Sequence, residues 1–205
     1  MLYFILFLLY NISIIYGIEY KNNEELYRNV IIASSIHCVT SSVMTILFLL
    51  NIISAYSYSF IVYYNIAYMG YDIILYLTKQ IPLKNSNEMI LHHTLLFIAA
   101  YFSQYDIYYY SRCLLCEVST IFLNLRWFAF KKIYFKNIIL YSILLYITFI
   151  ICRIINISNL LIEFYNKNLQ IYLCVGGLFF ILNIYWIYEL TKRGITMYKE
   201  LYSNK

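Results

Sequence analysis

Long apolar segments separated by short polar connections dominate the pattern of hydrophobic and polar positions along the 205 residues. Seven such segments can be counted, at residues 2–18, 29–51, 57–78, 88–103, 108–128, 137–157 and 169–191. Most approach the ~20 residues that a helix needs to cross a bilayer. The runs are continuous and do not alternate between apolar and polar positions, which favours helices over barrel strands. The pattern predicts an all-α, polytopic transmembrane helical bundle in a single domain.

Composition supports a membrane protein, because 63% of the residues are hydrophobic and 12% are charged. A soluble domain is roughly half apolar and a quarter charged. All five cysteines fall in the predicted spans, and Cys113 and Cys116 form a C-x-x-C that no second pair completes as a zinc set. We expect buried free thiols that behave as small hydrophobes. The net charge of +5 is interpreted as a topology signal, and nucleic acid is not expected as a partner.

Basic residues in the connections predict how the chain crosses the membrane. If all seven segments span, eleven Lys and Arg residues fall on one side, whereas Lys167 alone falls on the other. The positive-inside rule then places the C-terminus in the cytosol and the N-terminus in the lumen or outside. Residues 1–18 lack a basic leading region, so we expect a retained N-terminal transmembrane helix; the alternative is a cleaved signal peptide.

Polar side chains within the predicted spans gather at comparable depth in the cytosolic half. They are His37, Asp72, His92, His93, Glu117, Asn124 and Asn183. Charges inside a bilayer cost at least ~2.5–3.5 kcal/mol at the helix centre, so such residues face the interior of a bundle. We expect them to converge on one pocket that opens toward the cytosol. Adjacent helical residues point about 100° apart, so one histidine should face a cavity while the other bonds a neighbouring helix.

Two further features leave alternatives open. Arg112 and Arg153 either pair across helices or extend toward the lumenal face. Lys79, Lys84, Arg126, Lys131 and Lys132 surround the predicted cytosolic mouth. They set topology and attract anionic lipid, or form a docking rim for phosphates such as those of coenzyme A.

Several segments carry a resemblance to a known family. They are SSIHCVTSS (34–42), MGYDIILYL (69–77), LHHTLLFIAAYFS (91–103), LLCEVSTIFLNLRWF (114–128) and ILNIYWIYEL (181–190). Together they resemble the TLC-domain family, which includes the ceramide synthases. The string within 114–128 resembles the branch that includes TLC domain-containing protein 4. The resemblance implies six helices around a central cavity at residues 19–205, with residues 1–18 as an extra helix before them.

The resemblance also implies roles for individual residues. His92 and His93 occupy the paired-histidine position, which belongs to the catalytic site of ceramide synthases. Those enzymes carry a His-Asp and a further Asp downstream, where this chain reads CLLCEVST with Glu117 as its carboxylate. No homeobox-like segment is present. This departure points away from ceramide synthase activity itself and toward the relatives associated with membrane lipid homeostasis.

The sequence therefore predicts a multi-pass protein of the endoplasmic reticulum or another endomembrane that acts on membrane lipids, with acyl-CoA-dependent acyl transfer as the reaction. The expected catalytic residues are His92, His93, Asp72 and Glu117. The expected substrate-binding residues are His37, Thr120, Asn124, Arg126, Asn183 and Trp186. Acyl-CoA would be a co-substrate, with no metal and no resident cofactor.

Other functions share parts of this pattern. A non-enzymatic lipid-binding, lipid-sensing or cargo-receptor protein would use the same polar groups to recognise a head group. A seven-helix zinc hydrolase would take ligands from His37, Asp72 and the histidine pair, but the chain has three histidines and no H-x-x-x-H in its last span. A seven-helix receptor fits the number of spans, although its loops would be unusually short.

Overall fold

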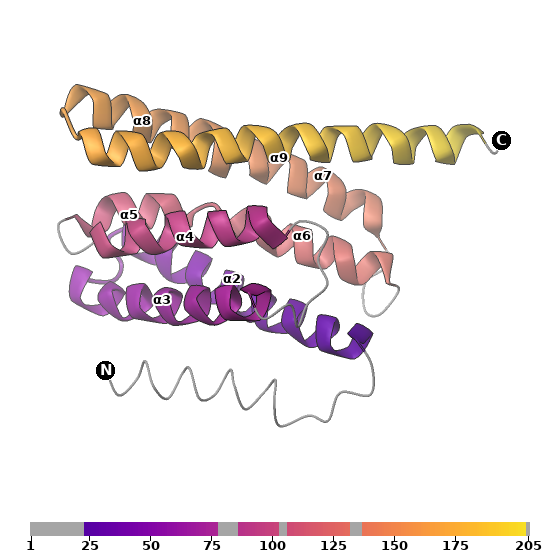
Figure 1. The fold of residues 1–205 in the computed structure, drawn as a ribbon, viewed down its shortest axis with the longest axis horizontal. Helices are drawn as coiled ribbons and strands as arrows, with labels where there is room; N and C mark the ends of the chain where they lie inside the picture. The colour runs from indigo at the N-terminus through magenta and orange to yellow at the C-terminus, as the bar shows by residue number, and fades with distance from the viewer. Residues whose placement is uncertain (1–22, 78–85, 103–105, 132–136, 204–205) are drawn as a thin grey trace.

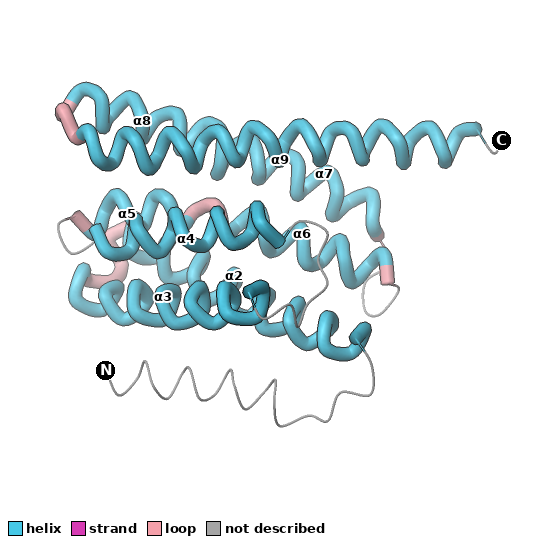
Figure 2. Tube along the Cα trace, in the orientation of Figure 1, coloured by secondary structure: helices cyan, strands magenta, loops and turns pink. Residues whose placement is uncertain are grey.

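The computed structural model describes residues 23–77, 86–102, 106–131 and 137–203, and the predicted first helix at 1–18 lies outside them. Within this part of the chain every regular element is helical (Figure 2). The elements are α2 (Asn23–Leu49), α3 (Ala55–Leu77), α4 (Ser86–Phe102), α5 (Ile107–Leu114), α6 (Glu117–Phe130), α7 (Ile138–Phe149), η1 (Ile150–Ile155), α8 (Asn156–Asn166) and α9 (Gln170–Ser203). The predicted all-α fold is confirmed.

The helices close into a ring. Helix α3 packs between α2 and α4, and α4 packs in turn against α9. Helix α9 packs against α8, α7 packs against α6, and α6 returns to α2. Because α5 and α6 follow each other in one direction, as do α7, η1 and α8, the ring consists of six rods. Seen from the side, α7, α8 and α9 lie above α4, α5 and α6, and α2 and α3 lie below them (Figure 1).

Five of these rods are long and apolar enough to cross a membrane, at Tyr27–Leu49, Ala55–Leu77, Ile107–Phe130, Ile138–Asn166 and Gln170–Thr196. Their outward faces carry large apolar side chains such as Ile36, Phe60 and Ile181, which are between 48% and 65% exposed. A lipid environment removes this surface from water. Helix α4 has 17 residues and corresponds to the segment predicted at residues 88–103.

Asparagine residues end two of the helices at the same end of the bundle. Asn51 and Asn168 adopt positive φ angles of 58° and 56°. The amide N–H groups of Ile52 and Leu169 then donate to the carbonyls of Leu47 and Phe164, five residues earlier. These are Schellman-type ends, in which asparagine tolerates the left-handed conformation. We call this end of the bundle the Asn168 end, and the opposite one the Lys131 end.

One predicted span ends too early. The segment 137–157 continues as a helix to Asn166, because polar residues that suggested a membrane boundary bind inside the bundle. Asn156 donates to the backbone carbonyl of Arg112 at 2.8 Å, and Glu163 accepts from Arg112 at 3.1 Å. Arg112 therefore pairs across helices. The extension also places Arg153 in the middle of a 29-residue span instead of near its end.

Candidate functional site

Polar side chains from separate helices meet at one level inside the ring. We call this group the polar layer, and it consists of His37, Asp72, His92, His93, Glu117, Arg153 and Asn183. All seven are 5% exposed or less. Counted at 1.5 Å per residue, they lie about 15–25 Å from the Asn168 end of their helices. Six of the seven residues that were predicted to converge lie in this layer. Asn124 does not, and Arg153 is a member that the sequence did not predict.

The two adjacent histidines turn to different neighbours. Nδ1 of His93 on α4 lies 3.0 Å from Oδ2 of Asp72 on α3. The approach is outside the angular range of a hydrogen bond, so the contact is electrostatic when the imidazole is protonated. Nε2 of His92 lies 4.0 Å from Oε1 of Glu117 on α6. Each imidazole therefore has its own carboxylate, as the 100° separation on a helix requires.

Glu117 receives two thiol hydrogen bonds. Cys38 of α2 donates to Oε2 at 3.1 Å, and Cys116 donates to Oε1 at 3.7 Å. Both cysteines are at most 1% exposed. Because a buried carboxylate requires donors, these thiols stabilise Glu117 beside His92. The expectation that the cysteines act only as small hydrophobes is wrong for this pair.

His37 of α2 joins the polar layer by stacking its ring on two tyrosines of α3. Its centroid lies 3.7 Å from that of Tyr68, with 12° between the planes, and 5.5 Å from that of Tyr64. The Tyr68 ring also meets His93 edge-on at 6.1 Å. Tyr68 thus contacts both His37 and His93.

Arg153 is the buried cation of the polar layer. Its Nε donates to the Ser119 hydroxyl at 2.7 Å, one terminal nitrogen donates to Asn183 Oδ1 at 3.1 Å, and the other donates to the Thr120 hydroxyl at 2.9 Å. The guanidinium also lies 5.3 Å from the Trp186 ring and 5.0 Å from the Phe149 ring. Cation–π contacts of this kind stabilise a desolvated arginine.

Departures from regular α-helix lie at the polar layer. Residues Ile150–Ile155 form a π-helical segment that contains Arg153. At the junction of α5 and α6, Cys116 and Ser119 donate to carbonyls three residues earlier, so the helix tightens next to Glu117. π-helical and 3₁₀ irregularities within helices often mark functional sites.

An apolar cavity of about 40 Å³ lies directly beside the polar layer, on the side of the Asn168 end. Four of its lining residues follow or precede a polar-layer residue by one helical turn. Leu96 is four residues from His92, Cys113 from Glu117, Ile157 from Arg153 and Phe179 from Asn183. Residues four apart lie on one face of a helix. The polar layer therefore caps one end of an apolar space.

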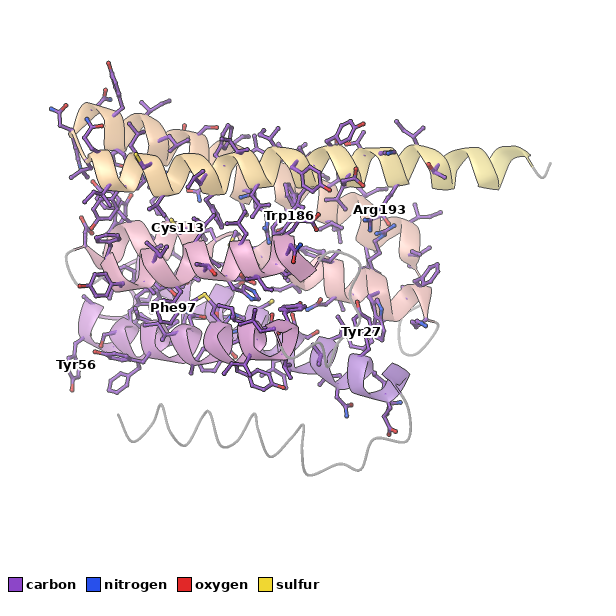
Figure 3. All side chains as sticks on the ribbon, viewed as in Figure 1. Tyr27, Tyr56, Phe97, Cys113, Trp186 and Arg193 are labelled. Atoms are coloured by element: carbon purple, nitrogen blue, oxygen red, sulfur yellow. The ribbon has the colours of Figure 1, made fainter. Side chains whose placement is uncertain are left out.

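Aromatic rings separate this cavity from a larger, open hollow of about 590 Å³ at the Asn168 end. Phe102, Tyr109 and Tyr172 line both spaces. In Figure 3, Cys113 lies between the layer of helices that contains α9 and the layer that contains α4 and α5, at the position of the cavity.

The sequence predicted an opening on the other side, toward the Lys131 end. There the structure places bulky rings: Tyr76 lies 6.5 Å from His93, and Trp186 of α9 lies 5.0 Å from His92. Figure 3 shows Trp186 between α9 and α4. The two cavities described here both lie on the Asn168 side of the polar layer. Among the described residues these two rings pack against the histidine pair on that side, and the cytosolic opening stays a prediction.

The predicted substrate-binding residues divide into two groups. Arg153 brings Thr120, Asn183 and Trp186 together around itself. Asn124 donates instead to Ser34 at 3.1 Å, about 10 Å along α6 from Glu117. Arg126 donates to Ser142 of α7 at 3.0 Å, still farther toward the Lys131 end. Neither is brought into the polar layer. Of the basic residues expected at the mouth, Lys79, Lys84 and Lys132 lie outside the described residues.

The sequence reasoning did not assign Arg153, Cys38 or Cys116 to the site. For Arg153 the signal existed, because a charge inside an apolar span is a functional candidate. Because this span was predicted to end at residue 157, Arg153 was also expected near the membrane interface, where it would need no partner inside the bundle. Cys38 and Cys116 differ from the other cysteines in their contact with Glu117, and the sequence does not show this contact.

His92, Cys116 and Glu117 also offer ligand atoms that lie within 4.8 Å of one another. This combination suits zinc, which binds imidazole, thiolate and carboxylate. Two features oppose it. Arg153 places a fixed positive charge near Cys116 and Glu117, and Nδ1 of His92 lacks a hydrogen-bond acceptor among the described residues. Metal-ligating histidines nearly always have such a partner on their second nitrogen.

The comparisons with known proteins agree with the architecture. The family model described as the TLC domain matches residues 4–192. No curated protein and no solved structure matches the chain.

Proposed function

Because the chain belongs to the TLC-domain family, we propose that it acts on membrane lipids by transferring an acyl group from acyl-CoA with the His92 and His93 pair. One observation carries this proposal: each histidine has a separate buried carboxylate, at 3.0 Å for His93 and Asp72 and at 4.0 Å for His92 and Glu117. An imidazole next to a carboxylate is the usual form of a general base or an activated nucleophile.

His92 is the better placed of the two for chemistry. Its ring stacks on Phe179 with centroids 5.2 Å apart, and Phe179 lines the apolar cavity. Its Nδ1 is buried and has no hydrogen-bond partner among the described residues. With the proton on Nε2, toward Glu117, the lone pair of Nδ1 is available to a substrate.

The reaction would use this lone pair as a base. Nδ1 removes a proton from the acceptor's hydroxyl or amine group as the acceptor oxygen or nitrogen attacks the thioester carbonyl carbon. The carbon–sulfur bond then breaks, and the imidazolium returns the proton to the sulfur of coenzyme A. Glu117 stabilises the imidazolium while it exists. In the alternative, Nδ1 itself attacks the thioester carbon and coenzyme A leaves as its thiolate. The acceptor oxygen or nitrogen then attacks the acyl carbon, the bond between this carbon and Nδ1 breaks, and the acceptor's proton goes to the thiolate.

The apolar cavity supplies a place for the acyl chain. At about 40 Å³ it has room for about three water molecules, so a long chain must displace the side chains of Phe102, Tyr109 and Tyr172. Beyond them lies the hollow of about 590 Å³. A chain that starts at His92 would therefore run toward the Asn168 end.

The proposal includes a location and an orientation. The excess of basic residues places the Lys131 end in the cytosol and the Asn168 end in the lumen. Acyl-CoA is made available on the cytosolic side, so it would reach the polar layer from the Lys131 end by displacing Trp186 or Tyr76. The membrane would be that of the endoplasmic reticulum or another endomembrane. The place of the chain in the branch of TLC domain-containing protein 4 stays a prediction.

Comparison of cellular lipids with and without the protein tests this function. We expect one lipid class to change its acyl composition when the wild-type chain is expressed, and to stay unchanged with a His92→Ala, His93→Ala double variant. Tyr58→Phe is the matched control, since Tyr58 is fully buried but bonds Thr45 away from the polar layer. Equal lipid profiles for wild type and double variant would contradict acyl transfer. Retention of a lipid by the purified protein without turnover would favour a binding or cargo function.

A further inference from the structure

Arg153 has an unusual set of partners for a buried cation. Its three hydrogen bonds go to uncharged oxygens, those of Ser119, Asn183 and Thr120. Among the described residues no carboxylate lies within 4.0 Å of the guanidinium. Buried charges in proteins are normally paired, and an arginine carries five N–H donors. Two donors are therefore left without an acceptor among the described residues, and Glu117 interacts with the guanidinium through its charge without contacting it.

The surroundings of Arg153 favour a particular kind of anion. Ile157, one turn along the same helix, and Phe179, one turn before Asn183, both line the apolar cavity. A ligand that contacts the guanidinium thus has a hydrocarbon space next to it. The guanidinium also lies about 20 Å from the nearer end of its span, a depth that suits a small anionic group at the end of an apolar chain.

We propose that Arg153, with Thr120 and Asn183 beside it, binds the oxygen atoms of an acyl group whose hydrocarbon chain occupies the apolar cavity. The ligand is the carboxylate of a free fatty acid or the carbonyl oxygen of an acyl thioester, which becomes negative during transfer. This inference deepens the proposed function by naming the residues that bind the acyl group, and it rests on that function. Arg153 lies within the π-helical segment, and its guanidinium lies over the rings of Phe149 and Trp186.

Arg153 would act together with His92. Trp186 contacts both, with its ring 5.0 Å from that of His92 and 5.3 Å from the guanidinium. An acyl carbonyl bound by Arg153 would then lie beside the imidazole that serves its reaction. Donors placed where negative charge develops are a major source of catalysis in acyl transfer.

Binding of labelled palmitic acid to the purified full chain in lipid nanodiscs tests this inference, with the matching fatty alcohol as the uncharged comparison. At alkaline pH we expect the wild type to bind the acid about tenfold or more tightly than the alcohol. Arg153→Gln should remove that preference and leave alcohol binding unchanged. Arg112→Gln is the matched control, because Arg112 also bonds across helices but lies outside the polar layer.

Further arms separate the possible outcomes. Competition by palmitoyl-CoA would identify the thioester as the ligand, and its failure to compete would identify the free acid. His92→Ala should keep the preference for the acid even if turnover is absent, so the binding result stands apart from the proposed reaction. If Arg153→Gln does not fold, Arg153→Lys should give an intermediate preference, because it keeps the charge without the planar fork. Equal binding of acid and alcohol by the wild type would overturn the inference.

Discussion

Nδ1 of His93 lies 3.0 Å from Oδ2 of Asp72, and this contact joins α4 to α3 inside the bundle. Both residues are at most 5% exposed. Polar side chains buried in a membrane need polar partners, and these two residues serve each other in that way. The pair positions α4, and with it the neighbouring His92 whose ring faces Glu117, Phe179 and Trp186.

Replacement of the carboxylate tests this pairing. We expect Asp72→Asn to slow acyl transfer by about 10²-fold, because a weaker contact with His93 would loosen the position of α4 and with it that of His92. Transfer of a labelled acyl group by the purified protein is the measurement. Glu189→Gln, which removes a carboxylate of α9 that lies 4.0 Å from Arg193, should leave the rate unchanged. An Asp72→Asn protein as fast as wild type would show that the ion pair has no part in turnover.

The thiols next to Glu117 should matter for stability. We expect Cys38→Ala to lower the free energy of unfolding by about 1–3 kcal/mol, because Glu117 loses a buried hydrogen-bond donor. Thermal unfolding in detergent measures this. Cys38→Ser keeps a donor and should stay closer to wild type, and Cys174→Ala, at an exposed position of α9, should have no effect. Equal losses of stability for Cys38→Ala and Cys174→Ala would show that the thiol of Cys38 does not stabilise Glu117.

Two adjacent glycines of α9 offer a test of the cavity wall. A Cβ atom on Gly176 would lie 3.1 Å from Cδ2 of Leu161, whereas one on Gly177 would meet nothing within 4 Å. Alanine favours a helix over glycine by about 1 kcal/mol, so Gly177→Ala should raise the melting temperature. Gly176→Ala should gain less and reduce binding of a long acyl chain, because Gly176 lines the cavity. Identical behaviour of the two variants would argue against a chain in this cavity.

Cysteine labelling tests the orientation. In a Cys174→Ala background, Lys131→Cys should react with a membrane-impermeant maleimide on intact microsomes, because the positive-inside rule predicts that this end lies in the cytosol. Lys167→Cys, at a position with its side chain 56% exposed, should react only after the membrane is opened. The reverse order of labelling would invert the proposed orientation and with it the side from which acyl-CoA arrives.

The sequence predicted the fold and six of the seven residues of the polar layer for identifiable reasons. Charged or imidazole side chains inside apolar runs must face a protein interior, which located Asp72, Glu117 and the histidine pair. Asn124 lies on the same side of α6 as Glu117, but seven residues farther along it bonds Ser34 outside the polar layer. Arg126 lies on the opposite side of α6 and bonds Ser142 of α7. The partners of a side chain depend on which helices adjoin, and a linear pattern does not contain this information.

Arg153 shows where the prediction failed. Its role depends on a helix that continues nine residues past the predicted end and on a π-helical segment within it. The extension depends on Asn156 and Glu163 finding Arg112 in a neighbouring helix. Local propensity favours a turn at these polar residues, and tertiary hydrogen bonds override it.

The reaction itself is tested most directly with purified protein in nanodiscs that contain a total membrane lipid extract and labelled palmitoyl-CoA. Wild type should move the label from the thioester into a lipid, and release free coenzyme A in equal amount. His92→Ala should abolish this transfer while its melting curve remains cooperative. Transfer by His92→Ala at the wild-type rate, or a wild-type protein that leaves all the label on coenzyme A with every acceptor lipid present, would contradict the central claim.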